Sequence, residues 1–178
     1  MFSLTLFALL TLPQPEQLRS GPPPGSEMGP YSFLIATGPK RGTQHCYVCE
    51  NRDKPVVLIF ARERSEELGR FLTDLDRIVE REKAAGLAGW VTFLADNQPA
   101  LEPELVNWSR KHGVRLIPLG IFEDKDGPPR YRLSTQADLT ILLVAQGKVK
   151  QNFAFKAGTF DTKKAKEVLH AIPTLIRP

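Results

Sequence analysis

The chain has 178 residues, of which 42% are hydrophobic and 25% charged, which is typical of one globular domain with room for a tail. Its net charge of +4 is spread over Lys and Arg residues mixed with Asp and Glu, and no basic block is interleaved with aromatic residues. This distribution predicts a mixed-charge surface and argues against nucleic-acid binding.

The N-terminus carries the longest apolar run, from Phe2 to Leu12. Its length fits the core of a secretory signal peptide, so we assign residues 1–12 to an export signal. Export predicts a secreted or periplasmic protein, whereas the alternative is a cytoplasmic one. No run is long enough to form a membrane-spanning helix, so we expect no integral membrane span once the signal is removed.

Residues 13–30 are rich in Pro and Gly and poor in apolar side chains, which predicts an extended linker. The domain is therefore expected to span residues 31–178. It opens with a short strand over 31–37 and a turn over 38–42, after which the chain returns as a strand or loop and completes an N-terminal β-hairpin.

The strongest strand signal is residues 55–61, a continuous apolar run that indicates a central strand buried on both faces. Ser65 is the expected N-cap of a helix that carries one apolar stripe to about Ala85. The remaining elements are strands over 90–95 and 116–122, a helix over 103–111, a hairpin over 140–155 and a helix from Asp161 or Thr162 to Ile172. This order predicts an α/β fold with a parallel core and a final antiparallel hairpin.

Three stretches resemble the thioredoxin-like superfamily, closest in layout to its redoxin (peroxiredoxin-like) branch. They are the strand over 55–61 with the helix from Ser65, the middle section over 90–122, and the hairpin that begins at Thr140. The resemblance implies a three-layer α/β/α fold with a mixed central sheet. The chain is also similar to a planctomycete-type group of exported thioredoxin-like proteins with an upstream cysteine pair.

Two hallmarks of that superfamily are missing at their usual places. The reactive cysteine would follow the central strand, where this chain reads Arg-Glu-Arg-Ser-Glu-Glu over residues 62–67. The cis-proline would precede the Thr140 strand, where Leu139 stands. Whether the chain is a thiol-disulfide oxidoreductase is therefore open at this point, and the pair Arg62 and Arg64 is interpreted as solvated charge rather than an anion site.

The two cysteines of the chain, Cys46 and Cys49, lie upstream of the central strand instead, with His45 beside them. We expect no helix to begin after either cysteine, and we expect the pair at the opposite end of the sheet from the superfamily's site. A thiolate there could be favoured only by His45 or by three nearby cations, Arg41, Arg52 and Lys54.

Three hypotheses follow for the pair. Cys46 and Cys49 cycle between dithiol and disulfide for a protein thiol partner, or their disulfide staples a non-catalytic interaction domain, or they bind zinc or copper together with His45. The metal hypothesis needs a fourth ligand, such as His112, which is otherwise expected to end a helix. No cofactor is predicted.

Overall fold

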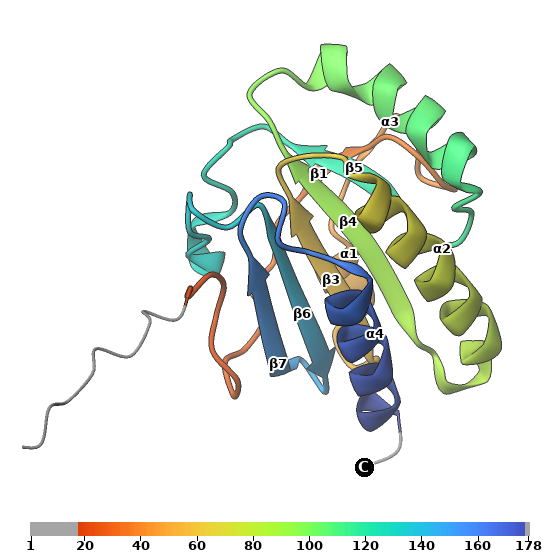
Figure 1. The fold of residues 1–178 in the computed structure, drawn as a ribbon, viewed down its shortest axis with the longest axis vertical. Coiled ribbons are helices and arrows are strands. Elements are labelled where there is room, and N and C mark those ends of the chain that lie inside the picture. Colours follow the sequence, from red (N-terminus) through yellow and green to blue (C-terminus); the bar gives the residue numbers. More distant parts are fainter. Residues whose placement is uncertain (1–17, 177–178) are drawn as a thin grey trace, which may run out of the picture.

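The structure is a computed structural model that describes residues 18–176 (Figure 1). The predicted export signal over 1–12 therefore lies outside the described residues. Between residues 18 and 176, no helix is both long and apolar enough to cross a membrane.

One mixed sheet of seven strands organises the domain, in the order β2-β1-β5-β4-β3-β6-β7. The predicted central strand is β3 (Val56–Ala61), which pairs in parallel with β4 (Ala88–Leu94) and antiparallel with β6 (Leu139–Ala145). All six residues of β3 are buried, as its unbroken apolar sequence predicts. The other strands are β1 (Phe33–Ile35), β2 (Gln44–His45), β5 (Leu119–Phe122) and β7 (Lys148–Phe155).

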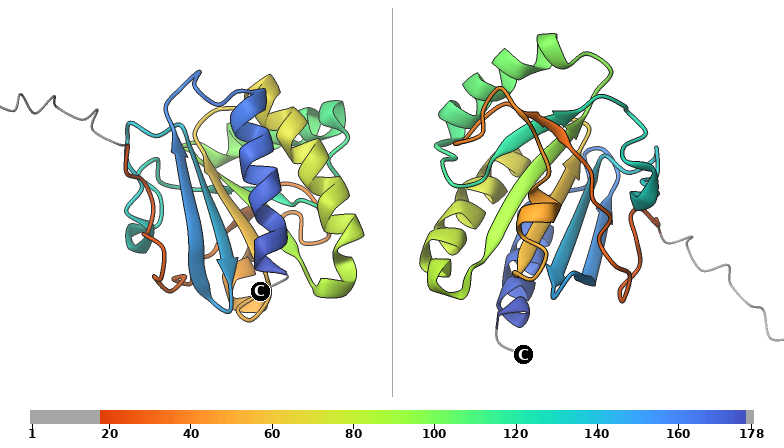
Figure 2. Two further views of the ribbon diagram at one scale, coloured as in Figure 1. Left: turned by 60° about the horizontal axis from the view of Figure 1, so that its bottom comes forward. Right: turned by 180° about the vertical axis from the view of Figure 1, so that it is seen from behind.

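Three long helices cover one face of the sheet: α2 (Glu66–Arg81), α3 (Gln98–His112) and α4 (Thr162–Ala171) (Figures 1 and 2). Each begins at a side chain that accepts a hydrogen bond from the first turn, namely Ser65, Asn97 and Asp161. The predicted helix over 103–111 starts earlier, at Gln98, because Asn97 supplies this cap. Short 3-10 turns follow α2 at Lys83–Ala85 and α4 at Ile172–Leu175.

The opposite face is covered more thinly and is rich in aromatic residues. A single helical turn, α1 (Tyr47–Glu50), and a 3-10 turn at Pro129–Tyr131 lie over it, as the rear view in Figure 2 shows for α1. Tyr31 is at the centre of this cluster, where its hydroxyl is 2.8 Å from Thr92 Oγ1 and accepts from Trp90 Nε1 at 3.1 Å. Burial raises the pKa of Tyr31.

The segment from Leu18 to Pro30, predicted to be part of a linker, is packed against the domain. Ser20 is 3% exposed, and its hydroxyl lies 2.6 Å from Thr140 Oγ1 while its carbonyl accepts from Asn152 Nδ2 at 2.8 Å. Residue Met28 is tied to the β6–β7 turn through a backbone hydrogen bond to Gly147. The segment is not a free linker, because it is hydrogen-bonded to polar groups of the sheet.

Candidate functional site

Cys46 and Cys49 are joined by a disulfide with an S–S distance of 2.06 Å. Cys46 follows β2 and is the N-cap of α1, where its sulfur accepts a hydrogen bond from the Cys49 backbone N–H at 3.2 Å. The expectation that no helix begins after either cysteine was wrong. Tyr47 and Val48 bury their side chains in the aromatic cluster, and this packing stabilises a single helical turn. So short a helix has no hydrophobic periodicity in the sequence by which it could be predicted.

The two sulfur-bearing residues differ in their surroundings. Cys46 is partly buried and packs against the aromatic cluster on the thin face. Cys49 is exposed.

Cys49 lies on the wall of a groove with a volume of about 420 Å³. One side comes from α1 and the turn after it, and the other comes from the N-terminal segment, the 3-10 turn at Arg130 and the β6–β7 turn. The lining residues are Glu27, Met28, Pro30, Val48, Cys49, Arg52, Asp53, Arg130, Gln146 and Gly147. Of these residues, the sequence analysis named only Cys49 and Arg52 as site candidates, because much of the lining comes from segments distant along the chain.

Of the cations expected near the cysteines, only Arg52 shares the groove with Cys49. Arg41 instead pairs with Glu102 at 3.0 Å, and Lys54 donates to Asn51 Oδ1 at 3.1 Å. The ring of His45 is held by Glu50, with Nε2 and Oε2 2.6 Å apart. His45 is therefore paired with a carboxylate of the neighbouring helix α1.

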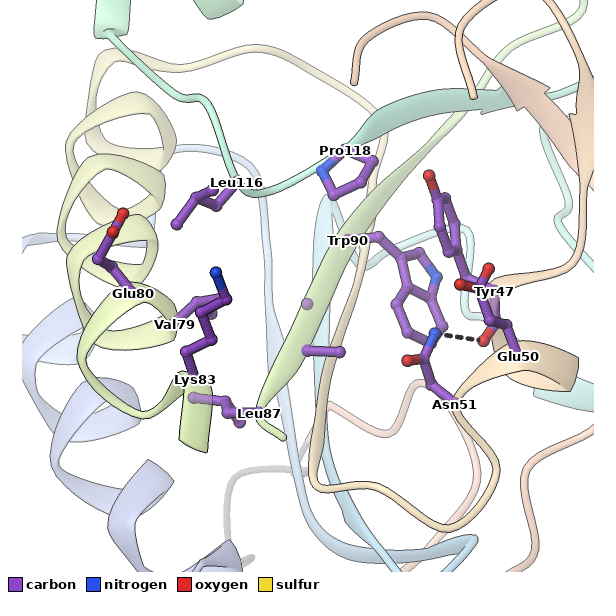
Figure 3. A pocket seen from close by; sticks show the side chains of 12 residues that line it. Tyr47, Glu50, Asn51, Val79, Glu80, Lys83, Leu87, Trp90, Leu116 and Pro118 are labelled. Carbon is purple, nitrogen blue, oxygen red and sulfur yellow. Dashed lines mark hydrogen bonds between the residues drawn. The ribbon is translucent and has the colours of Figure 1, made fainter. Parts of the chain in front are cut away.

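A second, smaller pocket of about 250 Å³ lies on the other side of α1 (Figure 3). Leu116, Val79 and Lys83 face Trp90 and Tyr47 across it, as the close view shows. Burial, and then the charge of Glu50, raises the pKa of Tyr47 to about 12. Leu116 is 42% exposed and is the large hydrophobic residue left most open among residues 18–176.

The metal hypothesis requires His45, Cys46 and Cys49 to form a ligand set together. In the described part of the chain, no three His, Cys, Asp or Glu side chains are grouped so that they could hold a metal ion. The two sulfurs are bonded to each other, and His112 packs against Gly69 of α2 on the other face of the sheet.

Comparison with solved structures identifies the architecture. A candidate thiol:disulfide interchange protein DsbE from Chlorobium tepidum matches with a TM-score of 0.65 at 14% identity, over 86% of this chain and 97% of the other. The fold is thioredoxin-like. The peroxidoxin BcpB from Mycobacterium tuberculosis also matches (TM-score 0.61, 13% identity, 86% and 97% covered), so redoxin-type proteins share this layout.

A third match is a secreted Mycobacterium tuberculosis disulfide oxidoreductase, homologous to Escherichia coli DsbE, with a TM-score of 0.59 and 10% identity over 82% of this chain and 96% of the other. No protein-family model and no curated protein sequence matches the chain. At these identities the similarity shows the thioredoxin-like fold and not the chemistry.

The disulfide lies at the opposite end of β3 from the usual thioredoxin-like site. Val56 at the start of β3 pairs with Val144, next to the β6–β7 turn that lines the groove, whereas Ala61 at its end pairs with Leu139. Five residue steps of strand separate the two ends by about 17 Å. The expected placement of the pair is therefore confirmed.

The usual site is filled by structural contacts instead. Arg62 is partly buried, and its guanidinium donates to the carbonyls of Ala137 at 3.0 Å, Ser134 at 3.3 Å and Lys125. The interpretation of Arg62 as solvated charge was wrong, because a partly buried guanidinium must satisfy its donors with these loop carbonyls. Ser65 caps α2 by accepting from Leu68 N–H at 3.1 Å. All peptide bonds between residues 18 and 176 are trans, including the one before Leu139.

Proposed function

We propose that the Cys46–Cys49 pair carries out thiol-disulfide exchange with a cysteine-bearing partner. The observation that carries the proposal is the position of Cys49, which is exposed, bonded to Cys46 and set on the wall of a groove. Structural disulfides are protected by burial, whereas exposed ones in a concave surface are open to attack by a partner thiolate.

The local chemistry supports exchange at this site. When the disulfide is reduced, the Cys49 backbone N–H that points at Cys46 Sγ can stabilise a Cys46 thiolate, because a hydrogen bond to the charged form lowers a thiol pKa. The α1 helix has only four residues, so this single donor and not a helix macrodipole is the source of the effect. The Glu50 carboxylate is hydrogen-bonded to His45.

The decisive experiment is a measurement of the reduction potential together with a protein-disulfide reductase assay. Exchange predicts a potential above about −300 mV, the region of labile and catalytic disulfides. It also predicts reduction of an insulin-type substrate, which the Cys46→Ser/Cys49→Ser variant should lose while it keeps its far-UV spectrum. A potential below that region with no reductase activity would exclude the proposal.

A non-catalytic staple is the second candidate, favoured by the burial of Tyr47 and Val48 between the cysteines. In that role the bond fixes an α1 turn too short to be stable alone. The chain-entropy relation gives about 2 kcal/mol for so small a ring. A staple therefore predicts that the double serine variant melts about 4–8 °C lower while partner binding is unchanged.

We also propose that the protein is exported, with residues 1–12 as the signal. A persistent disulfide is typical of oxidising compartments. Sequencing the mature N-terminus of protein recovered outside the cytoplasm tests this, and an intact Met1 on a cytoplasmic protein with reduced cysteines would contradict it.

A further inference from the structure

The groove beside the disulfide carries four charged side chains of both signs. Glu27 and Asp53 are acidic, and Arg52 and Arg130 are basic. All four are exposed, and within residues 18–176 none of them forms a salt bridge or a side-chain hydrogen bond. Their charges are therefore available to a ligand.

The walls that present these charges are fixed by the fold. Met28 N–H donates to the Gly147 carbonyl at 2.9 Å, and Tyr131 Oη donates to the Gly29 carbonyl at 2.8 Å. The stem of Arg130 lies against Gly29 so closely that a Cβ there would be 2.7 Å from Arg130 Cδ. Because these contacts hold the walls in place, the groove loses little conformational entropy when it binds a ligand.

The disulfide presents its two sulfurs unequally to this groove. Cys49 lines it and is exposed, whereas Cys46 packs against the aromatic cluster and is absent from the lining. The second cysteine of the pair, and not the first, therefore lines the groove.

We propose that Cys49 forms the mixed disulfide, and that its partner is a peptide thiol carrying both positive and negative groups, bound in this groove. This inference rests on the exchange function proposed above. The volume of about 420 Å³ is within the range of pockets that take small peptidic ligands. Ammonium and carboxylate groups of such a thiol would pair with the acidic and basic walls respectively.

The exchange proceeds in two steps. The partner thiolate attacks Cys49 Sγ, so a partner–Cys49 disulfide forms as the Cys49–Cys46 bond breaks. The bonding electron pair leaves on Cys46, whose thiolate accepts the hydrogen bond from Cys49 N–H. A second partner thiolate then attacks the partner sulfur of the mixed disulfide. The products are one partner disulfide and the reduced pair, with Cys49 taking its proton from solvent.

The first test maps the adduct on the native protein. Oxidised full-length protein is mixed with reduced glutathione as the probe, quenched with an alkylating agent and analysed by peptide mass mapping. We expect the glutathione adduct on Cys49 and the alkyl group on Cys46. If the disulfide exchanges but the adduct is on Cys46, this inference is overturned while the proposed function stands. If no thiol exchanges with it until the protein is denatured, the proposed function itself is overturned.

The second test measures rates with single-cysteine variants. Cys46→Ala, which keeps Cys49, should react with glutathione disulfide at least about tenfold faster than Cys49→Ala, because Cys49 lines the groove and Cys46 does not. The uncharged probe hydroxyethyl disulfide separates access from charge recognition. Replacing Arg52 and Arg130 by Gln in the Cys46→Ala protein should slow glutathione disulfide about fivefold and leave the uncharged probe unchanged. Arg70→Gln, on the exposed side of α2, is the matched control.

A third arm identifies the source of the peptide thiol. A disulfide-linked dimer of a twenty-residue peptide with one cysteine is compared with glutathione disulfide at equal concentration. A faster reaction of the long peptide supports a polypeptide partner, and a faster reaction of glutathione disulfide supports a small peptidic thiol. Equal rates for both charged probes and for hydroxyethyl disulfide would overturn the charge recognition.

Discussion

The guanidinium of Arg62 crosses the end of the sheet to Ala137, where its Nε donates to the carbonyl oxygen at 3.0 Å. The same side chain reaches the Ser134 and Lys125 carbonyls, so one residue after β3 ties down the loop that precedes β6. In a thioredoxin-like fold this is the end of the sheet where redox chemistry is usual. In this protein, that end of the sheet is instead held by the hydrogen bonds of Arg62.

The contacts of Arg62 predict the cost of removing it. Arg62→Met leaves loop carbonyls without donors, and we expect a loss of about 1.5–3 kcal/mol in the free energy of unfolding. Arg64→Met is the control, because its exposed pair with Glu104 should be worth less than about 1 kcal/mol. Urea denaturation of both variants measures the difference. Equal losses would show that the Arg62 hydrogen bonds are not decisive.

Ser20 tests whether the N-terminal segment belongs to the domain. Its hydroxyl forms a buried hydrogen bond with Thr140 Oγ1 and accepts a partly buried one from Ser134 N–H at 3.0 Å. Ser20→Ala leaves these groups unpaired and should cost about 1–3 kcal/mol. Ser26→Ala removes a hydroxyl that makes no hydrogen bond within residues 18–176 and should be close to neutral. A neutral Ser20→Ala would restore the description of this segment as a free linker.

The contact between Gly69 and His112 decides whether a substitution at Gly69 stabilises or destabilises the protein. A Cβ on Gly69 would lie 2.3 Å from Cε1 of His112, whose side chain is only 8% exposed. Gly69→Ala therefore should destabilise the protein by about 1–3 kcal/mol, although Ala favours helix formation.

The same pair provides its own control. In a His112→Ala protein the clash is gone, and Gly69→Ala should become neutral or stabilising by up to about 1 kcal/mol. A thermal-melting double-mutant cycle measures this change of sign. If Gly69→Ala destabilises both backgrounds equally, the contact with His112 is not the cause.

Asp138 should make stability depend on pH. Burial, and then the charge of Glu63, raises the pKa of this carboxyl, while Arg62 opposes the rise. The pKa of Asp138 is higher in the folded state than in the unfolded state. Protonation of Asp138 therefore stabilises the folded protein fully below the unfolded-state pKa, and this stabilisation is lost as the pH rises through the folded-state pKa. At pH 7 the ionised carboxylate is therefore unfavourable.

Asp138→Asn should consequently raise the melting temperature at pH 7 by about 1–3 °C, with a gain that shrinks as the pH falls through the folded pKa. Melting curves of both proteins between pH 4 and 7 follow this difference, with the exposed Asp126→Asn as control. A gain that grows toward acid pH would contradict the direction of the pKa shift.

Local patterns in the sequence determined most of the fold. The unbroken apolar run of β3, the Ser65 cap, the helical stripe of α2 and the final hairpin are signals carried by neighbouring residues, and each led to the element observed. The spacing of Cys46 and Cys49 likewise identified the candidate site and its position before the central strand.

Only the tertiary structure decided how that site can work. The exposure of Cys49, the anchoring of Cys46 by aromatic residues and the groove between Arg52 and Arg130 depend on segments that meet through folding. The same holds for Ser20, which has no neighbouring partner and is fixed by Thr140, 120 residues away. Sequence periodicity reports which face of an element is buried, but it carries no information about which distant loops will form the wall of a groove.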